Sequence, residues 1–457
     1  MQDAASGRPM RVGYAQTTVA KVTDEGRELV RTRQFVNLEF SRDGQPIRQQ
    51  VTMTSFETAA GELVRFESQL AGGPSEMTTR GRVAGRELVM QVGTLGRTQT
   101  VRIPWQVDWG GPFAVEQSLK RQPLRPGEQR TVRGLTVLNV PGDTKLSAKD
   151  YEEVKLPSGA AKLLRVDCVA ELAGQRIEHV QWIDARGETL KSVMPGIGQE
   201  AVRTTKDDAL RPPTAKFDLL ATSIVPVAVP VAKDSRRVVY RARMKSGKIA
   251  GLFAEGLSQR VKPIDEQTAK ITVLAVRPDQ PAKPDFAEAP PTDADRAANS
   301  LVQSDDRLIV ELAKAAAPRE TDAWKIACAL EAVVNQTVQE KSLSQAFASA
   351  ADVARTREGD CTEHAVLLAA MCRARGIPAR GAFGLVYYAP KKGFAYHMWT
   401  EVWIVDRWVP LDATLALGGI GADHIKLGDS NLAGGSPLAD LLGVTQVLGR
   451  LELEVVE

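Results

Sequence analysis

A change of hydrophobic pattern near residue 300 constrains the fold of this chain more than any other feature of its sequence. Before it, apolar and polar residues alternate in short runs that end at glycines or at turn dipeptides such as Asp43-Gly44. Alternation with a period of two is typical of β-strands that bury one face. After it, apolar residues recur three and four positions apart, as in helices. We therefore expect an α+β chain of several domains, in which a large antiparallel β-rich N-terminal region precedes a domain that contains helices.

The β-rich pattern begins near residue 10 and ends near residue 210. Strands are predicted at 30–40, 51–56, 63–70, 88–92, 162–172 and 177–182. Long helical periodicity does not interrupt them, so a twisted antiparallel sheet, a sandwich or an open barrel would fit. The segments 61–67 and 161–167 resemble each other weakly, which would suit two related lobes.

Prolines mark the expected domain boundaries. Arg211-Pro-Pro213 ends the alternation and opens a connector that can run as an extended edge. The segment 277–295 holds five prolines, which is typical of a stiff linker or strap. The predicted organisation is a β-rich domain at 1–210, a connector at 211–235, a small β unit at 236–290 and a domain with helices at 291–457.

Charge and hydropathy exclude several classes of protein. Lysine and arginine number 59 against 56 aspartates and glutamates, a formal net charge of +3 that gives no reason to expect a nucleic-acid partner. No apolar run approaches the roughly 20 residues that span a bilayer. Met1-Gln-Asp3 lacks the positive start and apolar stretch of a signal peptide. The chain would be cytoplasmic as written, or periplasmic or envelope-associated if an export segment was removed and a start Met added.

The second half predicts helices and then strands. Ser304 and Thr321 are the expected N-caps of the first two helices, and Ser349 with Asp352 resembles a capping box for a third. Helices are predicted at 305–317, 322–337, from Ser349 to about Gly359, and 361–376, and strands at 380–388, 397–405 and 408–411.

Cys361 is the candidate nucleophile of this half. It opens a predicted helix, where unpaired N–H groups and the positive end of the helix dipole favour the thiolate. Cys168, Cys328 and Cys372 lie within a strand or a helix and lack this setting. Four cysteines without a CxxC pair predict neither a disulfide scaffold nor a metal site.

His397 and Asp412 are the candidate partners of the thiol. A thiolate needs a base that holds and returns its proton, and the base needs a third group to fix its tautomer. A turn at Asp406-Arg407 would pair Asp412 with Glu401 and leave it about 13 Å along the sheet from His397. A bulge or strong twist must shorten that distance; otherwise Glu401 is the rival partner of His397.

One other histidine and two tryptophans complete the candidates. His364, one turn after Cys361, is either an alternative base or a histidine beside the site. Trp399 and Trp403 would wall an acyl groove or pack in the core, and with His364 they are the candidate substrate-binding residues. His179 and His424 are predicted to have no acidic or thiol company, and neither a metal nor a cofactor is predicted.

These residues lie in four blocks whose order resembles the transglutaminase-like superfamily, a circularly rearranged relative of papain-type enzymes. The blocks, all within about 300–425, are Glu358–His364, Arg373–Arg380, His397–Val402 and Trp408–Thr414. The resemblance implies a papain-like α+β catalytic domain with Cys361 as nucleophile, His397 as general base and acid, and Asp412 as orienting carboxylate. It also implies a second oxyanion donor from an upstream segment, for which Trp324, Ser344 and Gln345 are candidates. Animal members also use calcium, but no EF-hand type of loop is present here.

The predicted function is cysteine-dependent acyl transfer on peptide or carboxamide bonds through a thioester, with a protein or peptide as substrate. Hydrolysis is favoured over amine cross-linking, because the bacterial members of the superfamily are more often peptidases or amidases. The alternative is a non-enzymatic scaffold of the cell envelope that binds a lipoprotein, glycan or protein partner through the β-rich region. That region resembles the one that precedes this domain in envelope-associated bacterial relatives.

Overall fold

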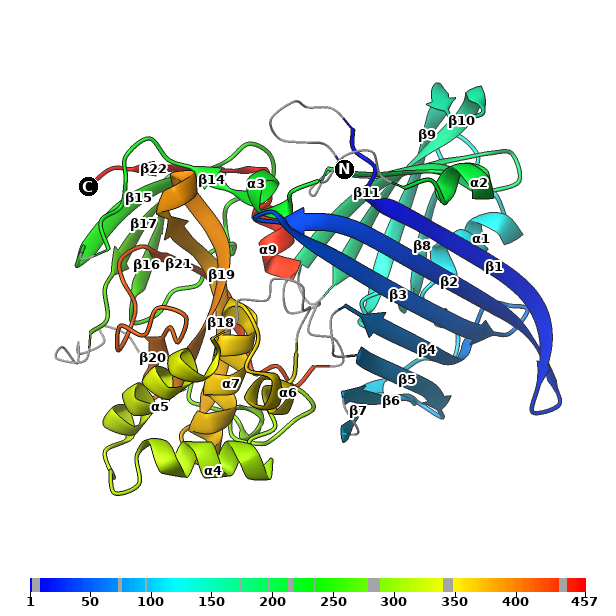
Figure 1. The fold of residues 1–457 in the computed structure, drawn as a ribbon. Helices are drawn as coiled ribbons and strands as arrows, with labels where there is room; N and C mark the ends of the chain where they lie inside the picture. Colours follow the sequence, from blue (N-terminus) through cyan, green and yellow to red (C-terminus); the bar gives the residue numbers. More distant parts are fainter. Residues whose placement is uncertain are drawn as a thin grey trace. The chain divides into compact units, whose positions relative to one another are not determined.

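The protein divides into two compact units, Met1–Asp218 and Leu219–Glu457, in the computed structural model (Figure 1). The first is almost entirely antiparallel β-sheet, and the second combines helices with two smaller sheets. The predicted fold class is thus confirmed. The structure describes residues 1, 9–72, 76–94, 97–172, 175–195, 198–212, 217–233, 235–277, 288–339, 348–434 and 442–457.

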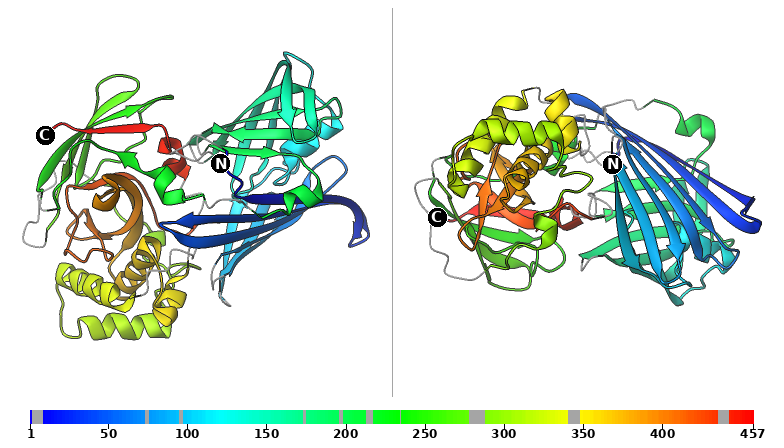
Figure 2. Two further views of the ribbon diagram at one scale, coloured as in Figure 1. Left: turned by 45° about the horizontal axis from the view of Figure 1, so that its top comes forward. Right: turned by 90° about the horizontal axis from the view of Figure 1, so that it is seen from below.

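The first sheet of the N-terminal unit is an antiparallel meander of seven strands in chain order, and its twist is visible in Figure 2. Its strands are β1 (Gly13–Asp24), β2 (Arg27–Arg42), β3 (Gln45–Glu57), β4 (Leu63–Ala71), β5 (Glu76–Ala84), β6 (Glu87–Thr94) and β7 (Arg97–Pro104). The turn predicted at Asp43-Gly44 joins β2 to β3. Both of its residues have positive φ, 50° and 80°, as a type I′ hairpin turn requires.

The second sheet of this unit has six antiparallel strands, again in chain order. They are β8 (Gln129–Leu135), β9 (Pro141–Leu156), β10 (Gly159–Leu172), β11 (Gln175–Ile183), β12 (Thr189–Met194) and β13 (Gln199–Val202), and the helices of the unit are α1 (Ala114–Arg121) and α2 (Lys206–Ala209). Leu119 of α1 packs on Leu146, Val166 and Ile183 of this sheet. The two weakly similar segments lie in β4 and β10, one in each sheet.

The C-terminal unit contains a five-stranded and a four-stranded sheet. The first has the order β14-β19-β18-β21, with β20 paired to β19, and the second has the order β16-β17-β15-β22. The strands are β14 (Val225–Pro226), β15 (Arg237–Met244), β16 (Gln259–Pro263), β17 (Thr268–Leu274), β18 (Ala379–Tyr388), β19 (Gly393–Trp403), β20 (Trp408–Leu411), β21 (His424–Ser430) and β22 (Leu451–Val455). Both sheets contribute to one apolar core, in which Tyr240, Ile271, Phe394 and Ile425 are fully buried.

All four predicted helices are present, although two of the predicted caps are wrong. The helices are α4 (Arg307–Ala316), α5 (Ala323–Thr337), α6 (Ala350–Thr356) and α7 (Cys361–Ala374), and shorter ones are α3 (Leu219–Ser223), η2 (Asp293–Asp295), η3 (Ala389–Lys391) and α9 (Leu442–Val447). Asp306 and Asp322 cap α4 and α5 in place of Ser304 and Thr321, because their carboxylates accept backbone N–H groups of the first turn. No helix in these described ranges is long and apolar enough to cross a membrane.

Candidate active site

The start of α7 is fixed by a capping box. The Asp360 side chain accepts the N–H of Thr362 at 2.8 Å, and the Glu363 side chain accepts the N–H of Asp360 at 3.0 Å. A Cβ added to Gly359 would lie 2.3 Å from the Cβ of Glu363, so only glycine fits before the box. Cys361 is therefore held as the first residue of the helix, partly exposed. Its backbone N–H belongs to the first turn, where the helix offers no acceptor.

The other three cysteines are also free thiols, of which Cys168 and Cys372 are buried and Cys328 is partly exposed. Burial raises the pKa of Cys168 and Cys372 far above the ordinary value. Burial, with the charges of Glu331 and Asp322, raises the pKa of Cys328 to about 12. Thiols that hold their protons this strongly are poor nucleophiles.

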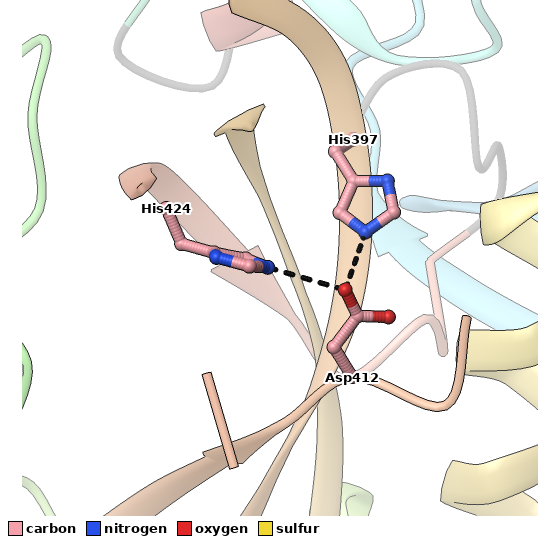
Figure 3. Close-up of side chains that lie close together, drawn as sticks. All are labelled: His397, Asp412 and His424. Carbon is pink, nitrogen blue, oxygen red and sulfur yellow. Dashed lines mark hydrogen bonds and ion pairs between the residues drawn. The ribbon is translucent and has the colours of Figure 1, made fainter. Parts of the chain in front are cut away.

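His397 links the thiol to a carboxylate. It lies on β19, and its Nε2 is 2.8 Å from Oδ2 of Asp412 (Figure 3). The Cys361 sulfur also acts on this ring and helps to raise the pKa of His397. Because Nε2 is engaged by Asp412, Nδ1 is the nitrogen left for the sulfur. His397 is thus bonded to Asp412 and influenced by the charge of Cys361, and these three residues are the candidate series Cys361–His397–Asp412.

The charges of this series support one another. Burial lowers the pKa of His397, but the Asp412 carboxylate and the Cys361 sulfur outweigh burial and hold that pKa well above its ordinary value. Burial likewise raises the pKa of Asp412, and its contacts with His397 and His424 lower it far below the ordinary value. Asp412 thus stays ionised at neutral pH and favours an imidazolium at His397 beside the sulfur.

The hairpin between β19 and β20 turns one residue earlier than predicted. Its central residues are Val405 and Asp406, with positive φ of 46° and 60°, and the N–H of Ile404 donates to the carbonyl of Arg407. The predicted turn at Asp406-Arg407 is therefore wrong. A β-branched residue at positive φ is rare, so no residue type at 405 marks this turn.

The shift of one residue in the turn moves the strand register by two. Thr400 lies opposite Leu411, and Glu401 lies opposite Pro410 rather than opposite Asp412. Asp412 is the next residue after this register ends, so it comes two residues closer to His397 than predicted. The distance of about 13 Å does not arise, and no bulge is needed to close it.

Glu401, the rival partner, belongs to a separate cluster of charges. Its Oε2 accepts hydrogen bonds from Arg380 at 2.8 Å and from Lys426 at 2.7 Å. Asp429 binds the same two cations, each at 2.8 Å. These cations neutralise Glu401, and His397 bonds to Asp412 instead.

His424 was not among the predicted site residues, and the expectation that it has no acidic company is wrong. Its Nε2 lies 3.1 Å from the Asp412 Oδ2 that also bonds to His397, and its Nδ1 lies 2.8 Å from Oδ1 of Asp423. Asp423 next to His424 was a signal in the sequence. The contact with Asp412 required the register of β18 and β21.

Helix α5 holds the segment that carries Asp412, which sequence analysis also missed. Glu331 accepts the N–H of Asp412 at 3.1 Å and the N–H of Gly418 at 2.8 Å. One turn later, Asn335 donates to the carbonyls of Ala413 and Thr414 at 2.9 and 3.2 Å. Burial raises the pKa of Glu331 to about 8. Two polar residues four apart on one face of α5, Glu331 and Asn335, were the available signal.

The remaining candidates have different surroundings. His364 is buried, its Nδ1 lies 2.6 Å from the carbonyl oxygen of Asp360, and burial lowers its pKa. Trp399 is buried and stacks on His397 with ring centres 6.3 Å apart. Trp403 packs edge-on to Trp408. Trp324 lies in the first turn of α5, whereas Ser344 and Gln345 lie outside the described residues.

A metal ion is not needed to explain this site. The side-chain ligand atoms of His397, Asp412 and His424 lie within 4.8 Å of one another. However, both rings are oriented by hydrogen bonds to the same carboxylate oxygen, and we assign the cluster to proton chemistry.

Comparison with known families gives the class of this unit. Residues 311–413 match the family model of the transglutaminase-like superfamily, a stretch that includes Cys361, His397 and Asp412. This match supports an enzyme of that superfamily. Residues 311–413 of this chain are a transglutaminase-like domain, and the resemblance found in the four sequence blocks is confirmed.

Solved structures with some similarity have low scores. A candidate cysteine protease from Cytophaga hutchinsonii has 18% identity and a TM-score of 0.30, and the match covers 48% of this chain and 83% of that one. A β-barrel-like protein of unknown function from Brucella abortus has 12% identity, coverages of 41% and 93%, and a TM-score of 0.28. A candidate protease from Parabacteroides distasonis has 10% identity, coverages of 77% and 68%, and a TM-score of 0.19. No curated protein matches the chain. Scores this low carry no argument about function.

Proposed function

We propose that this protein is a cysteine hydrolase that cleaves peptide or carboxamide bonds through a thioester on Cys361. The observation that carries the proposal is the series Cys361–His397–Asp412, in which a thiol at a helix start meets an imidazole held by a buried carboxylate. Each member has the surroundings that its role requires: a partly exposed sulfur, a raised pKa at His397 and an ionised Asp412.

The proposed reaction uses this series, the backbone N–H of Cys361 and water. The Cys361 thiolate attacks the carbonyl carbon, and the backbone N–H of Cys361 donates to the oxyanion. His397 gives its proton to the departing amine as the C–N bond breaks, which leaves a thioester. His397 then takes a proton from water, whose oxygen attacks the thioester. The acid leaves, the sulfur returns to its ion pair with His397, and Asp412 stays a carboxylate throughout.

The fate of the thioester defines the rest of the proposal. Water as acceptor gives a peptidase or amidase, and an amine as acceptor gives a cross-linking enzyme. We favour water, as expected for the bacterial members of the superfamily. The substrate is a protein or peptide.

Profiling of the host proteome tests this proposal. Wild-type protein and the Cys361→Ala variant are incubated with host extract, and new peptide termini, deamidated side chains and isopeptide links are mapped by mass spectrometry. The proposal predicts termini or deamidation that depend on Cys361. Isopeptide links would mean that an amine is the acceptor, and identical products from both proteins would favour the alternative of a scaffold.

A further inference from the structure

We propose that His424 is a positioning residue of this site, and that with Asp423 it extends the series Cys361–His397–Asp412 into a chain of five residues. The inference rests on the proposed function, because it assigns His424 a role in orienting Asp412 for the reaction on Cys361. Neither the family match nor the four sequence blocks include His424, which lies beyond residue 413.

The geometry of Asp412 is the first argument. A single oxygen, Oδ2, receives Nε2 of His397 at 2.8 Å and Nε2 of His424 at 3.1 Å (Figure 3). The other oxygen, Oδ1, accepts the N–H of Thr414 at 2.8 Å. Loss of His424 would leave Oδ2 with one side-chain donor, and the carboxylate could then rotate away from His397. His424 therefore helps to aim Asp412 at the catalytic base.

The surroundings of His424 are the second argument. Its ring is fully buried and lies between two carboxylates, since Nδ1 meets Asp423 at 2.8 Å and Nε2 meets Asp412. A ring whose two nitrogens both face carboxylate oxygens is fully satisfied only as an imidazolium, with an N–H at each end. Burial lowers the pKa of His424, but the bonds to Asp412 and Asp423 outweigh burial and raise it. One positive charge therefore sits beside the His397–Asp412 pair.

Several other titratable groups surround these five residues. Lys426, two residues further along β21, is bound to Glu401 and Asp429. The groups that face the chain from other elements are His397 from β19, Glu331 from α5, Cys361 and His364 from α7, and Tyr240 from β15. The Tyr240 hydroxyl donates to the carbonyl of Ala422 and stays protonated, because burial raises its pKa. None of these is a second cation at Asp423, so His424 is its counter-ion within the described residues.

The positive charge of His424 should lower the pKa of His397. The centres of the two imidazole rings are 5.8 Å apart. A cation at that distance opposes protonation of His397 and favours the thiolate of Cys361. Replacement of His424 by a neutral side chain should therefore move the titration of His397 and the acid limb of Cys361 alkylation to higher pH. Asp412→Asn removes a negative charge and should move the titration of His397 in the opposite direction.

The experiment compares His424→Gln with His424→Ala in the full chain. Glutamine can still donate to Asp412 from the position of Nε2, whereas alanine cannot. The readouts are the rate of Cys361 alkylation by iodoacetamide against pH, and the imidazole signals of histidine-selectively labelled protein against pH. The chain has only four histidines, so each signal is assigned by a single substitution. His179→Gln, on β11 of the N-terminal unit, is the matched control.

The expected results separate the two roles of His424. His424→Gln should shift both midpoints upward by about one pH unit. His424→Ala, which also lets Asp412 turn away from His397, should shift the alkylation midpoint further upward and the His397 midpoint less, and His179→Gln should change neither quantity. Asp423→Asn, which leaves the contact with Asp412 in place, should lower the titration midpoint of His424 by about one unit.

Several results would overturn the inference. A wild-type His424 that is neutral at pH 7 would contradict its charged state, and a His397 midpoint unchanged in His424→Gln would contradict the coupling. Equal alkylation in the alanine and glutamine variants would contradict the positioning role. If wild-type Cys361 shows no preferential alkylation at all, the proposed function fails. In that case the histidine titrations still test the role of His424. If His424→Gln does not fold, the titration of His424 in Asp423→Asn provides the test.

Discussion

At the scale of single residues, the chemistry of this site depends on where three side chains keep their protons. The pKa of Asp412 is lowered by two imidazoles, and the pKa of His397 is raised by Asp412 and Cys361. The thiol lies at a helix start with partial exposure, which leaves room for an approaching carbonyl group. Removal of the sulfur should therefore abolish chemistry and leave the fold intact.

Cys361→Ala tests this separation of chemistry from stability. Because the thiol is partly exposed, its removal should change the free energy of unfolding by about 1 kcal/mol or less, while any acyl-transfer activity is lost. Denaturant unfolding and turnover of a substrate found by proteome profiling are the two measurements. Retained turnover in this variant would refute the assignment of the nucleophile.

Asp412→Asn tests the third member of the series. The amide weakens the hold on the productive tautomer of His397, so turnover should fall by about four orders of magnitude while the fold is kept. The lowered pKa of Asp412 adds stability that is present above about pH 4, the unfolded value, and is lost as the pH falls towards the folded value. The free energies of unfolding of wild type and variant should therefore converge in acid.

The matched control for this prediction is Glu401→Gln. The Glu401 carboxylate lies on β19 and bonds to Arg380 and Lys426, not to His397. The substitution therefore removes a charge from the same strand without removing a partner of His397. Glu401→Gln should destabilise the protein, because it leaves the buried Lys426 and the half-buried Arg380 with one carboxylate fewer. Loss of activity that is larger in Glu401→Gln than in Asp412→Asn would reverse the two assignments.

Residue-level analysis of the sequence could find the side chains that chemistry requires, but not those that hold them. Cys361 stood out by its place at a helix start, and His397 and Asp412 by their order along the chain. His424 and Glu331 reach Asp412 only through the loop after β20 and the packing of α5. Local spacing can mark these residues as unusual, but it does not show that they contact Asp412.

At the scale of elements, the hairpin of β19 and β20 decides whether the site exists. A shift of one residue in its turn moves the register by two and would carry Asp412 away from His397. The structure fixes the turn at Val405 and Asp406, although valine is poorly suited to positive φ. We infer that the pairing of the flanking strands, not the turn residues, sets the register.

Val405→Asn tests this inference. Asparagine tolerates positive φ, and Val405 is 75% exposed, so little packing is lost. The free energy of unfolding should rise by up to about 1 kcal/mol with activity unchanged. Val405→Ala, which removes the β-branch but is less suited to positive φ than asparagine, is the control and should gain less. A loss of activity in Val405→Asn would show that the turn residues do control the register.

Helix positions could be predicted from the sequence, whereas caps could be predicted only in part. The Ser349–Asp352 box is present as predicted. At α4 and α5 two acceptable caps lie close together, and propensity alone does not choose between Ser304 and Asp306 or between Thr321 and Asp322. The outcome depends on which backbone N–H groups the packed helix leaves open.

At the scale of the whole molecule, local patterns located the strands but not their long-range partners. The C-terminal strand β22 pairs with β15, which begins at Arg237. Alternation predicts each strand separately, and nothing in it links residues two hundred positions apart. The two-unit division, by contrast, falls close to the proline-marked connector.

We propose that the N-terminal unit folds without the C-terminal one, because it has its own two sheets and its own apolar cores. Trypsin under native conditions should cut first near Arg211–Lys216 or within 277–295, stretches rich in prolines and basic residues, of which 213–216 and 278–287 lie outside the described residues. Mass analysis should then find a stable fragment that ends near residue 210. First cuts within 30–200 would mean that the boundary is misplaced.

The most direct test of the central claim is the rate at which each cysteine reacts with iodoacetamide at pH 6. The raised pKa of His397 keeps its imidazolium populated at this pH, and the imidazolium stabilises a thiolate at Cys361. Peptide mass mapping should find Cys361 labelled well ahead of Cys168, Cys328 and Cys372. His397→Ala should remove that advantage, and His364→Ala should reduce it less. Equal slow labelling of all four cysteines in the wild-type protein would contradict a catalytic thiol, and a larger effect of His364→Ala would exchange the roles of the two histidines.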